Sequence, residues 1–249
     1  RHGQPQKGEF MKAFVGIDLG TTNSAIGSFD GDETRVWKSP EQNDVTPSAI
    51  LFDRRGNKYV GRKAYDSAPL NPGNAALLFK RFMGTSSRVP IDCLDEPLTP
   101  EECSAEILRT LFGYLPEEVR LAEEVGTVIT VPAAFNQMQK NATLEAAEQA
   151  GIGAVALMQE PVAAVMSVVR AREADGTFMI YDLGGGTLDI ALAESIGGRV
   201  NLLSHDGIAV CGGRDFDRDI VDGVVKPWLF EQFDLPKDFS ANKEFEGVR

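Results

Sequence analysis

The chain has 249 residues, 43% of them hydrophobic and 25% charged, which is typical of one or two globular domains. Its formal net charge of −12 without a basic stripe argues against a nucleic-acid partner, and no apolar run is long enough to indicate a membrane protein. Three cysteines without a CxxC pair argue against a disulfide framework or a zinc site, so we expect a reducing, cytoplasmic location.

Residues 1–11 show no hydrophobic periodicity, and we interpret them as a leader or a remnant of cloning that lies outside the fold. The first ordered pattern is FVGIDLGTTNSAIGSF at residues 14–29. An apolar strand ends at Asp18, the chain turns through Leu-Gly-Thr-Thr-Asn, and a second strand follows. This pattern predicts a hairpin with a small, polar tip.

The middle of the chain alternates between helix and strand patterns. A helix is predicted over residues 99–115, because Thr99 and Glu102 form a capping box and Pro100 takes the first helical position. An apolar stretch at residues 127–135 predicts a buried strand. This alternation favours an α/β fold.

The alternation continues beyond this strand. Asn136 can cap a helix whose alanines form a thin packing stripe as far as Gly151. A short strand is predicted over residues 154–158, and Glu160-Pro161 begins another helix with proline in a favourable early position. We interpret residues 226–249 as the beginning of a further element.

A second hairpin repeats the first. MIYDLGGGTLDIAL at residues 179–192 also has an apolar strand, an Asp-Leu-Gly sequence, a glycine and threonine tip and a returning strand. Asp182 follows Asp18 at the same distance as Gly184 follows Gly20, so the chain contains the same hairpin twice. The repeat predicts two related lobes.

The two hairpin tips are candidate phosphate sites of an unusual kind. The P-loop pattern GxxxxGK[ST] is absent, and the consecutive glycines followed by a strand do not fit the Rossmann fingerprint. Successive N–H groups of a tight turn can converge into an anion nest, and glycine would permit both positive φ and close phosphate approach. The alternative for a single DLGGGT sequence is a bulge or sharp corner in a sheet.

A carboxylate borders each candidate nest. Asp18 and Asp182 would repel a phosphate unless a cation lies between them. Mg²⁺ is typically bound through one or two carboxylates together with substrate phosphates. We therefore expect the two aspartates to serve a magnesium ion, through water, while the hairpins face each other across the β- and γ-phosphates.

Seven motifs resemble one family in order and spacing, from about Phe14 to Val221. The chain resembles the ATPase domain of the seventy-kilodalton heat-shock chaperones, and Met83 makes it similar to divergent, bacterial-type members. The motifs are GIDLGTTNS (16–24), TPSAI (46–50), FKRFMG (79–84), VPAAFN (131–136), EPVAA (160–164), DLGGGT (182–187) and GGRDFD (212–217). The resemblance implies an actin-like, ribonuclease H-like two-lobed ATPase fold of mixed sheets flanked by helices, with ATP or ADP, Mg²⁺ and, as a further ion, K⁺.

The resemblance also implies roles for individual residues. It implies that Lys80 orients the γ-phosphate and the attacking water, and that Glu160 and Pro132 link nucleotide state to lobe rotation. Catalytic roles are implied for Lys80, Glu160, Thr187 and Asp189, and a metal role for Asp18 and Asp182. The implied nucleotide-binding residues are Gly20, Thr21, Thr22, Asn23, Gly184, Gly185, Gly186, Thr187, Gly212 and Gly213.

The expected domain organisation follows the same resemblance. A first lobe would span residues 12–176, with a core of 12–45 and 119–176 and an inserted subdomain at 46–118. Residues 177–249 would form an incomplete second lobe, because the chain stops before the segments that grip adenine. A substrate-binding domain would lie outside this chain, and we expect weak nucleotide affinity.

Three functions remain open from the sequence. The first is an ATP-hydrolysing chaperone domain that couples nucleotide state to unfolded polypeptide, and Lys80, Glu160 and Thr187 favour it. The second is a regulatory or scaffold relative that binds nucleotide with little turnover. The third is a small-molecule kinase or phosphatase with the same fold.

Departures from the family pattern bear on the first two. The family usually has other residues at Ala134, Lys140, Ala156, Gln159 and Arg214, where nucleotide state is coupled to the interdomain linker and the J-domain partner. A J-domain co-chaperone and a nucleotide-exchange factor are thus expected partners whose coupling departs from the standard. No nucleic acid or membrane partner is expected.

Overall fold

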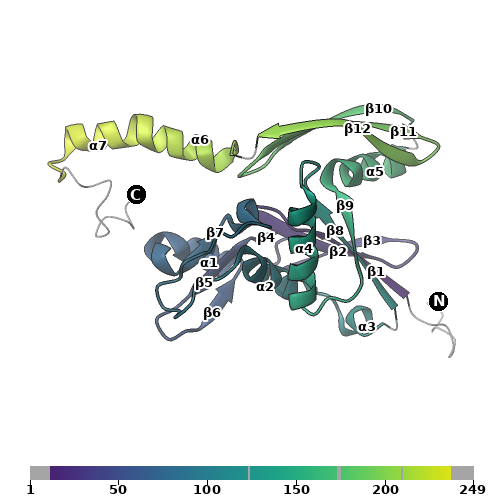
Figure 1. The fold of residues 1–249 in the computed structure, drawn as a ribbon, viewed down its shortest axis with the longest axis horizontal. Helices are drawn as coiled ribbons and strands as arrows, with labels where there is room; N and C mark the ends of the chain where they lie inside the picture. The colour runs from purple at the N-terminus through teal and green to yellow at the C-terminus, as the bar shows by residue number, and fades with distance from the viewer. Residues whose placement is uncertain (1–11, 123, 173–174, 209, 237–249) are drawn as a thin grey trace.

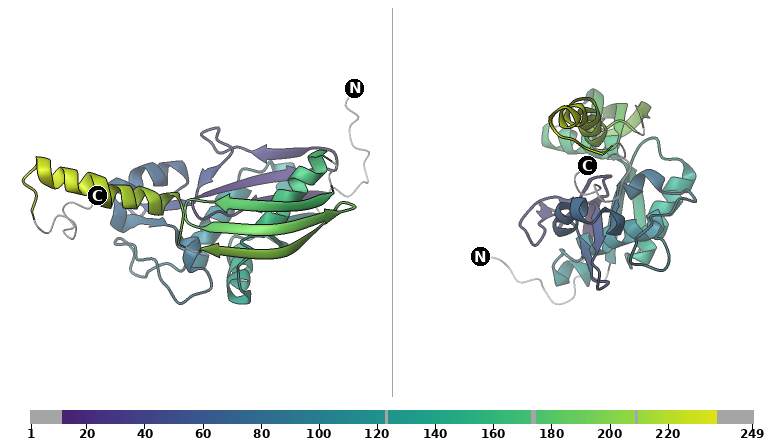
Figure 2. Two further views of the ribbon diagram at one scale, coloured as in Figure 1. Left: turned by 90° about the horizontal axis from the view of Figure 1, so that it is seen from above. Right: turned by 90° about the vertical axis from the view of Figure 1, so that its left-hand side faces the viewer.

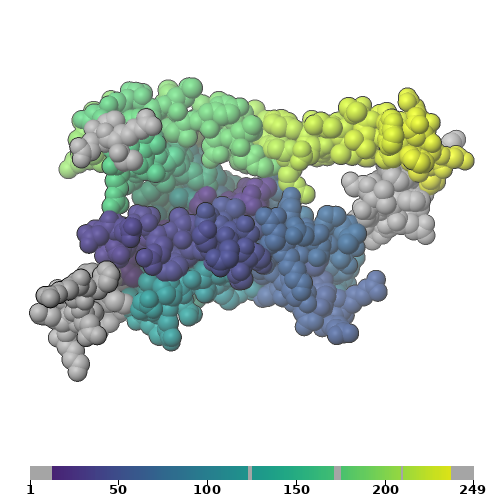
Figure 3. All heavy atoms as spheres, turned by 180° about the vertical axis from the view of Figure 1, so that it is seen from behind, coloured from purple at the N-terminus to yellow at the C-terminus, as the bar shows by residue number. Residues whose placement is uncertain are grey.

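The computed structural model describes residues 12–122, 124–172, 175–208 and 210–236, and the expectation for residues 1–11 lies outside these ranges. The described residues form two bodies, one above the other in Figure 1. The lower body holds a mixed sheet with flanking helices, and the upper body holds a three-stranded sheet that continues into a helical rod. Seen from behind, the surface is hollowed along the line between the two bodies (Figure 3).

The main sheet of the lower body has the order β3-β2-β1-β8-β9, and a short strand, β4 (Thr46–Pro47), also pairs with β2. β1 and β2 are antiparallel, whereas β8 is parallel to both β1 and β9. Its apolar strands β1 and β8 lie in the middle, as buried strands should. The strands are β1 (Lys12–Asp18), β2 (Asn23–Phe29), β3 (Thr34–Trp37), β8 (Glu124–Val131) and β9 (Val155–Gln159).

The helices against this sheet begin where their capping residues predict. α2 (Pro100–Phe112) has the complete Thr99–Glu102 capping box with proline at its start, and α4 (Gln137–Gln149) is capped by Asn136. Both predictions are confirmed. α3 (Glu117–Arg120) is a single turn, and α5 (Glu160–Arg172) begins at the predicted Glu160.

A small sheet of order β6-β5-β7 lies beside the main sheet. It contributes to the site through the segment that follows β7, a short 3₁₀ turn, η3 (Phe79–Phe82), which carries Lys80. The strands of this small sheet and the helical segments between them in the chain are β5 (Ala49–Phe52), β6 (Lys58–Val60), α1 (Arg62–Ser67), η1 (Ala68–Leu70), η2 (Pro72–Asn74) and β7 (Ala75–Leu77).

The upper body is a β-meander in the order β10-β11-β12, with α5 packed against it. The strands are β10 (Gly176–Leu183), β11 (Leu188–Ile196) and β12 (Arg199–Ile208). A helical rod then runs beyond the sheet through α6 (Gly213–Ile220), a π-helical turn η4 (Val221–Val225) and α7 (Lys226–Gln232), as Figure 2 shows. Of the element predicted at 226–249, α7 lies in the described part and residues 237–249 do not.

The main core lies in the lower body. Ile17, Ile26 and Ile129 of the sheet pack with Ile107 and Leu108 of α2, and all five are at most 1% exposed. Among the described residues, the apolar cluster of the upper body is small and is built from Val165 and Val169 of α5 and Ala193 of β11. Burial of apolar surface therefore stabilises the lower body far more than the upper one.

The sequence predictions of a mixed α/β fold and a repeated hairpin are confirmed. β1 and β2 pair antiparallel around residues 19–22, and β10 and β11 pair antiparallel around residues 184–187. The expected lobe and subdomain boundaries stay predictions. No helix among the described residues has the length and apolar character needed to cross a membrane.

Candidate functional site

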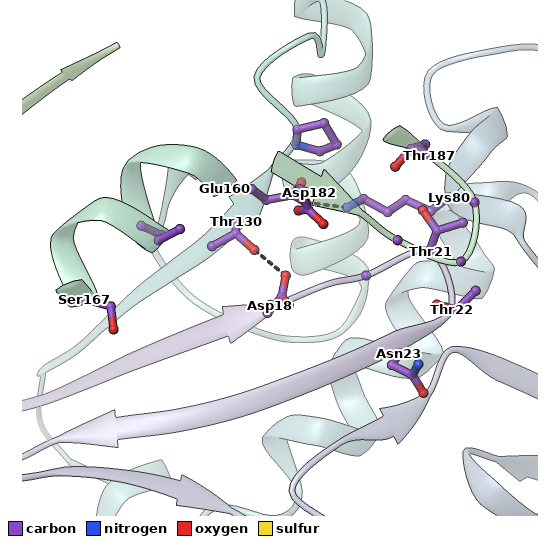
Figure 4. Close-up of a pocket in the computed structure, with 17 residues that line it drawn as sticks. Asp18, Thr21, Thr22, Asn23, Lys80, Thr130, Glu160, Ser167, Asp182 and Thr187 are labelled. Carbon is purple, nitrogen blue, oxygen red and sulfur yellow. Dashed lines mark hydrogen bonds and ion pairs between the residues drawn. The ribbon is translucent and has the colours of Figure 1, made fainter. Parts of the chain in front are cut away.

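A cavity of about 630 Å³ lies between the two hairpin tips, within the size range of small-ligand sites. The first hairpin, the second hairpin, η3 and α5 all contribute to its wall (Figure 4). It brings together most of the predicted site residues. Those that line it are Asp18, Gly20, Thr21, Thr22, Asn23, Lys80, Pro132, Glu160, Asp182, Gly184, Gly185, Gly186 and Thr187.

The first loop is hydrogen-bonded to Ser48, a residue that is 2% exposed. The Ser48 hydroxyl donates to the Gly20 carbonyl at 2.7 Å and the Ser48 N–H donates to the Thr22 carbonyl at 2.8 Å. Ser24 Oγ accepts from the Gly20 N–H at 3.1 Å and lies 2.9 Å from Ser48 Oγ. These bonds orient the carbonyl groups of Gly20 and Thr22 toward Ser48.

The second loop is hydrogen-bonded to the start of α6. The Gly184 N–H donates to the Thr187 carbonyl at 3.0 Å and closes the hairpin tip. The Gly213 N–H donates to the Gly184 carbonyl at 3.0 Å, and the Arg214 N–H donates to the Gly185 carbonyl at 3.1 Å. Within the described ranges, the N–H groups of Gly185, Gly186 and Thr187 donate to no acceptor. A loop with satisfied carbonyls and free N–H groups is suited to binding an anion.

The two loops touch, and this contact is what requires glycine. A Cβ on Gly185 would lie 2.4 Å from Thr22 Cγ2, and a Cβ on Gly186 would lie 2.7 Å from Thr21 Cγ2. In the first loop, a Cβ on Gly20 would lie 1.9 Å from the Asn23 carbonyl oxygen. None of these loop glycines has positive φ, so that part of the sequence interpretation is wrong. Close packing explains the glycines instead, against the Thr22 and Thr21 side chains at Gly185 and Gly186 and against the backbone of its own loop at Gly20.

Lys80 points into the cavity and pairs with Glu160. Lys80 Nζ lies 2.8 Å from Glu160 Oε1, and 5% of the Lys80 side chain and 19% of the Glu160 side chain are exposed. Lys80 Nζ also lies 5.6 Å from the centre of the Phe135 ring. Burial raises the pKa of Glu160, Lys80 opposes the rise, and the nearby Asp18 and Asp182 add to it.

The turn that carries Lys80 is anchored from below. Met83 is fully buried, and the Ser104 hydroxyl of α2 donates to its sulfur at 3.2 Å. The Gly84 N–H donates to Glu101 Oε1 at 2.9 Å, and Gly84 has φ of +70°. A Cβ on Gly84 would lie 2.8 Å from the backbone of Met138, so this glycine allows η3 to pack on the start of α4.

Asp18 is the last residue of β1, Asp182 is the last but one of β10, and both line the same cavity. The Thr130 hydroxyl donates to Asp18 Oδ1 at 2.7 Å and orients that carboxylate (Figure 4). Among the described residues, no group of three or more His, Cys, Asp or Glu side chains could hold a metal by itself. Two carboxylates beside a phosphate-binding loop fit Mg²⁺, which usually takes its remaining ligands from phosphates and water.

Three predicted site residues lie away from this cavity wall. Asp189 lines a neighbouring cavity of about 220 Å³ that Glu160 and Asp182 also border. Burial raises the pKa of Asp189, a hydrogen bond from Thr187 opposes this, and Asp182 adds to it. Gly212 and Gly213 lie behind the second loop, where a Cβ on Gly212 would lie 2.3 Å from the Gly186 nitrogen. Their direct contact with nucleotide stays a prediction.

Sequence reasoning missed four residues that shape the site. Ser48 belongs to the TPSAI motif and Arg81 to the FKRFMG motif. Both motifs were recognised in the sequence, but no role was predicted for either residue. Asp215 belongs to GGRDFD and accepts from the Gly212 N–H at 3.0 Å. Thr130 had no signal beyond its strand, because only the parallel pairing of β1 with β8 places it opposite Asp18.

Comparison with protein families identifies a related family. A family model described as Hsp70 protein matches residues 14–92 and 85–245 of the chain. The two matched segments together cover both hairpins, η3 and α5.

Proposed function

Because this chain belongs to the Hsp70 family, whose nucleotide-binding domain has the actin-like ATPase fold, we propose that it binds ATP between its two glycine loops and hydrolyses it to ADP and phosphate. The family match makes the chain a chaperone-type nucleotide-binding domain. Domains of this family generally bind ATP or ADP with Mg²⁺. K⁺ is proposed as a further ion.

One observation carries the proposal. Two loops line one cavity, and the carbonyl groups of both loops accept hydrogen bonds from other parts of the protein. The side chain of Lys80, which is buried, points into the same cavity. The free N–H groups of Gly185, Gly186 and Thr187 supply donors for phosphate oxygens without adding a full positive charge. A nucleotide polyphosphate is the ligand that this combination suits best.

The side chains of the cavity have distinct tasks in this proposal. Lys80 stabilises the charge that develops on the transferring phosphoryl group and orients the attacking water. Glu160 holds Lys80 in the cavity through their ion pair. Thr187 adds a hydroxyl at the tip of the second loop.

Asp18 and Asp182 would hold Mg²⁺, which when bound neutralises phosphate charge. Thr130 keeps Asp18 turned toward that position through its hydrogen bond. Asp189 lies beyond the wall and supports Thr187 through their hydrogen bond. We assign it a supporting role in the site.

The wider chaperone function is part of the same proposal. Nucleotide state would control the binding of unfolded polypeptide by a domain outside this chain, in the cytoplasm and under stress. Family members generally work with co-chaperones, so a J-domain protein and a nucleotide-exchange factor are the proposed partners. The departures at Ala134, Lys140 and Gln159 lie where that coupling occurs in the family.

A second function is a regulatory or scaffold module that binds nucleotide with little turnover. The departures from the family pattern at Ala134 and Ala156 favour it, whereas the cavity residues of the first proposal are all in place. The two proposals agree on binding and differ only in the rate of phosphate release.

Calorimetric titration of MgATP, with a parallel phosphate-release assay, tests the proposal. We expect binding that weakens when EDTA removes Mg²⁺ and that also weakens in Thr187→Ala. The exposed Thr85→Ala is the matched control, because among the described residues its hydroxyl bonds only to the nearby Phe82 carbonyl and Ser87 N–H. Binding with no measurable turnover would support the regulatory function, and no binding at any concentration would overturn both.

A further inference from the structure

Arg81 follows Lys80 directly in η3, but its guanidinium reaches the other body of the molecule. Arg81 Nη2 donates to the Gly186 carbonyl at 2.6 Å and to Asp215 Oδ2 at 2.9 Å. Only 14% of the Arg81 side chain and 12% of the Asp215 side chain are exposed. Two consecutive residues of one turn thus serve the site differently, since Lys80 enters the cavity and Arg81 holds its wall.

Asp215 extends the hold of Arg81 to the start of α6. The same oxygen, Oδ2, accepts from the Gly212 N–H at 3.0 Å, and Asp215 is the third residue of α6. Burial raises the pKa of Asp215, but the hydrogen bonds from Arg81 and from Gly212 outweigh it, so the pKa is lowered and the carboxylate stays charged.

With Arg81, three consecutive carbonyls of the second loop are occupied. The Gly213 and Arg214 N–H groups hold the carbonyls of Gly184 and Gly185, and Arg81 holds that of Gly186. The first two donors belong to the same body as the loop, whereas Arg81 belongs to the body that carries the first loop. The bond from Arg81 to the Gly186 carbonyl therefore connects the second loop directly to η3, the turn that also carries Lys80.

Gly186 is closely packed, so a shift of Arg81 would move the second loop. A Cβ on Gly186 would lie 2.9 Å from Arg81 Nε and 2.7 Å from Thr21 Cγ2. The guanidinium and the first loop thus pack on the same glycine. Arg81 Nε is buried and has no hydrogen-bond partner among the described residues. The arginine leaves one donor unsatisfied while keeping its other bonds to the loop.

We propose that Arg81 is a positioning residue of the nucleotide site, which sets the spacing of the two phosphate loops by linking Gly186 and Asp215 to the turn that carries Lys80. This inference rests on the proposed ATP binding. ATP has a third phosphate that can engage both loops and Lys80 together, so its affinity depends on the spacing more than that of ADP does. Both bonds come from the same guanidinium nitrogen, Nη2, whose two N–H groups meet the Gly186 carbonyl and the Asp215 carboxylate. Arginine suits the role because its guanidinium is planar and stays charged when buried.

The test compares MgATP and MgADP affinities of the wild-type chain, Arg81→Met and Arg88→Met. Arg88 is an exposed arginine whose side chain, within the described part of the chain, bonds only to the carbonyls of Ser86 and Ser87, and it serves as the matched control. We expect Arg81→Met to weaken MgATP binding about tenfold, the loss typical of a charged hydrogen bond, and to weaken MgADP binding less. Arg88→Met should bind both as the wild type does.

Two further variants separate positioning from simple stabilisation. Arg81→Lys, which keeps a positive charge beside Asp215, should lose ATP preference to an intermediate extent. Asp215→Asn should weaken ATP binding, and combining it with Arg81→Met should add little, because both changes break one link. A melting temperature that falls while the ratio of ATP to ADP affinity stays at the wild-type value would overturn the role of Arg81.

Failure of this inference differs from failure of the proposed function. Wild-type protein that binds no MgATP would overturn ATP binding and the role of Arg81 with it. Wild-type binding that Arg81→Met and Arg81→Lys both leave unchanged would overturn the role of Arg81 alone.

Discussion

Lys80 Nζ and Glu160 Oε1 lie 2.8 Å apart although 80 residues separate them in the chain. The pair joins η3 to the first turn of α5, and 5% of the Lys80 side chain is exposed. A buried ion pair is costly to break, because the remaining partner keeps an uncompensated charge. The cavity therefore holds its cation in place before any ligand binds.

Lys80→Met should abolish turnover while leaving nucleotide binding measurable, because the cation acts on charge that develops in the transition state. We also expect the free energy of unfolding to fall by about 3 kcal/mol at neutral pH, since Glu160 loses its partner. The exposed Lys38, paired with Asp44, provides the control Lys38→Met, which should change stability by less than about 1 kcal/mol. Phosphate release and denaturant unfolding measure the two effects, and a Lys80→Met protein with wild-type turnover would contradict the assignment.

Glu160 should make stability depend on pH in a direction opposite to most carboxylates. Its pKa in the folded state is raised above the unfolded value, so the folded state binds the proton more tightly. The resulting contribution is full below the unfolded pKa and is lost as pH rises through the folded pKa. Relative to Glu160→Gln, the wild type should gain unfolding free energy as pH falls from neutral toward that range. Parallel unfolding curves of the two proteins across this range would count against the raised pKa.

Gly212→Ala and Gly213→Ala should differ although the residues are adjacent. A Cβ on Gly212 meets the backbone of Gly185 and Gly186 within 2.7 Å, whereas a Cβ on Gly213 has its nearest neighbour at 4.0 Å. We expect Gly212→Ala to lower the free energy of unfolding by about 1–3 kcal/mol and to weaken ATP binding. Gly213→Ala should be neutral for stability.

The same pair tests whether the diglycine contacts nucleotide. If Gly213→Ala weakens MgATP binding without loss of stability, Gly213 touches the ligand as the family resemblance implies. Wild-type affinity in Gly213→Ala would limit the diglycine to support of the second loop. Calorimetry and thermal unfolding of both variants distinguish these outcomes.

Ser48→Ala should release the first loop. The Ser48 hydroxyl donates to the Gly20 carbonyl and lies within hydrogen-bond distance of Ser24 Oγ, and its loss removes the donor of the Gly20 carbonyl and one neighbour of Ser24 Oγ. We expect the free energy of unfolding to fall by about 1–3 kcal/mol and MgATP binding to weaken. The exposed Ser86→Ala is the control. Full ATP affinity in Ser48→Ala would show that the first loop keeps its shape without this hydroxyl.

The local elements and the repeated hairpin could be predicted from the amino-acid sequence alone. Thr99, Glu102 and Asn136 start their helices through bonds to residues three positions away, so the information lies within one turn. The hairpins around Asp18 and Asp182 pair strands that are neighbours in the chain. The sequence also supplied the motifs that identified the family and nearly all of the cavity wall.

Which residues lie together in the site depends on the folded arrangement of the chain. Arg81 and Asp215 meet across 134 residues, and Thr130 reaches Asp18 across 112. The reason for the loop glycines was also tertiary, because the atoms that exclude a Cβ from Gly185 and Gly186 belong to the opposite loop, at Thr22 and Thr21. Sequence patterns encode backbone geometry over a few residues, whereas these contacts depend on how the two bodies pack, which no local pattern records.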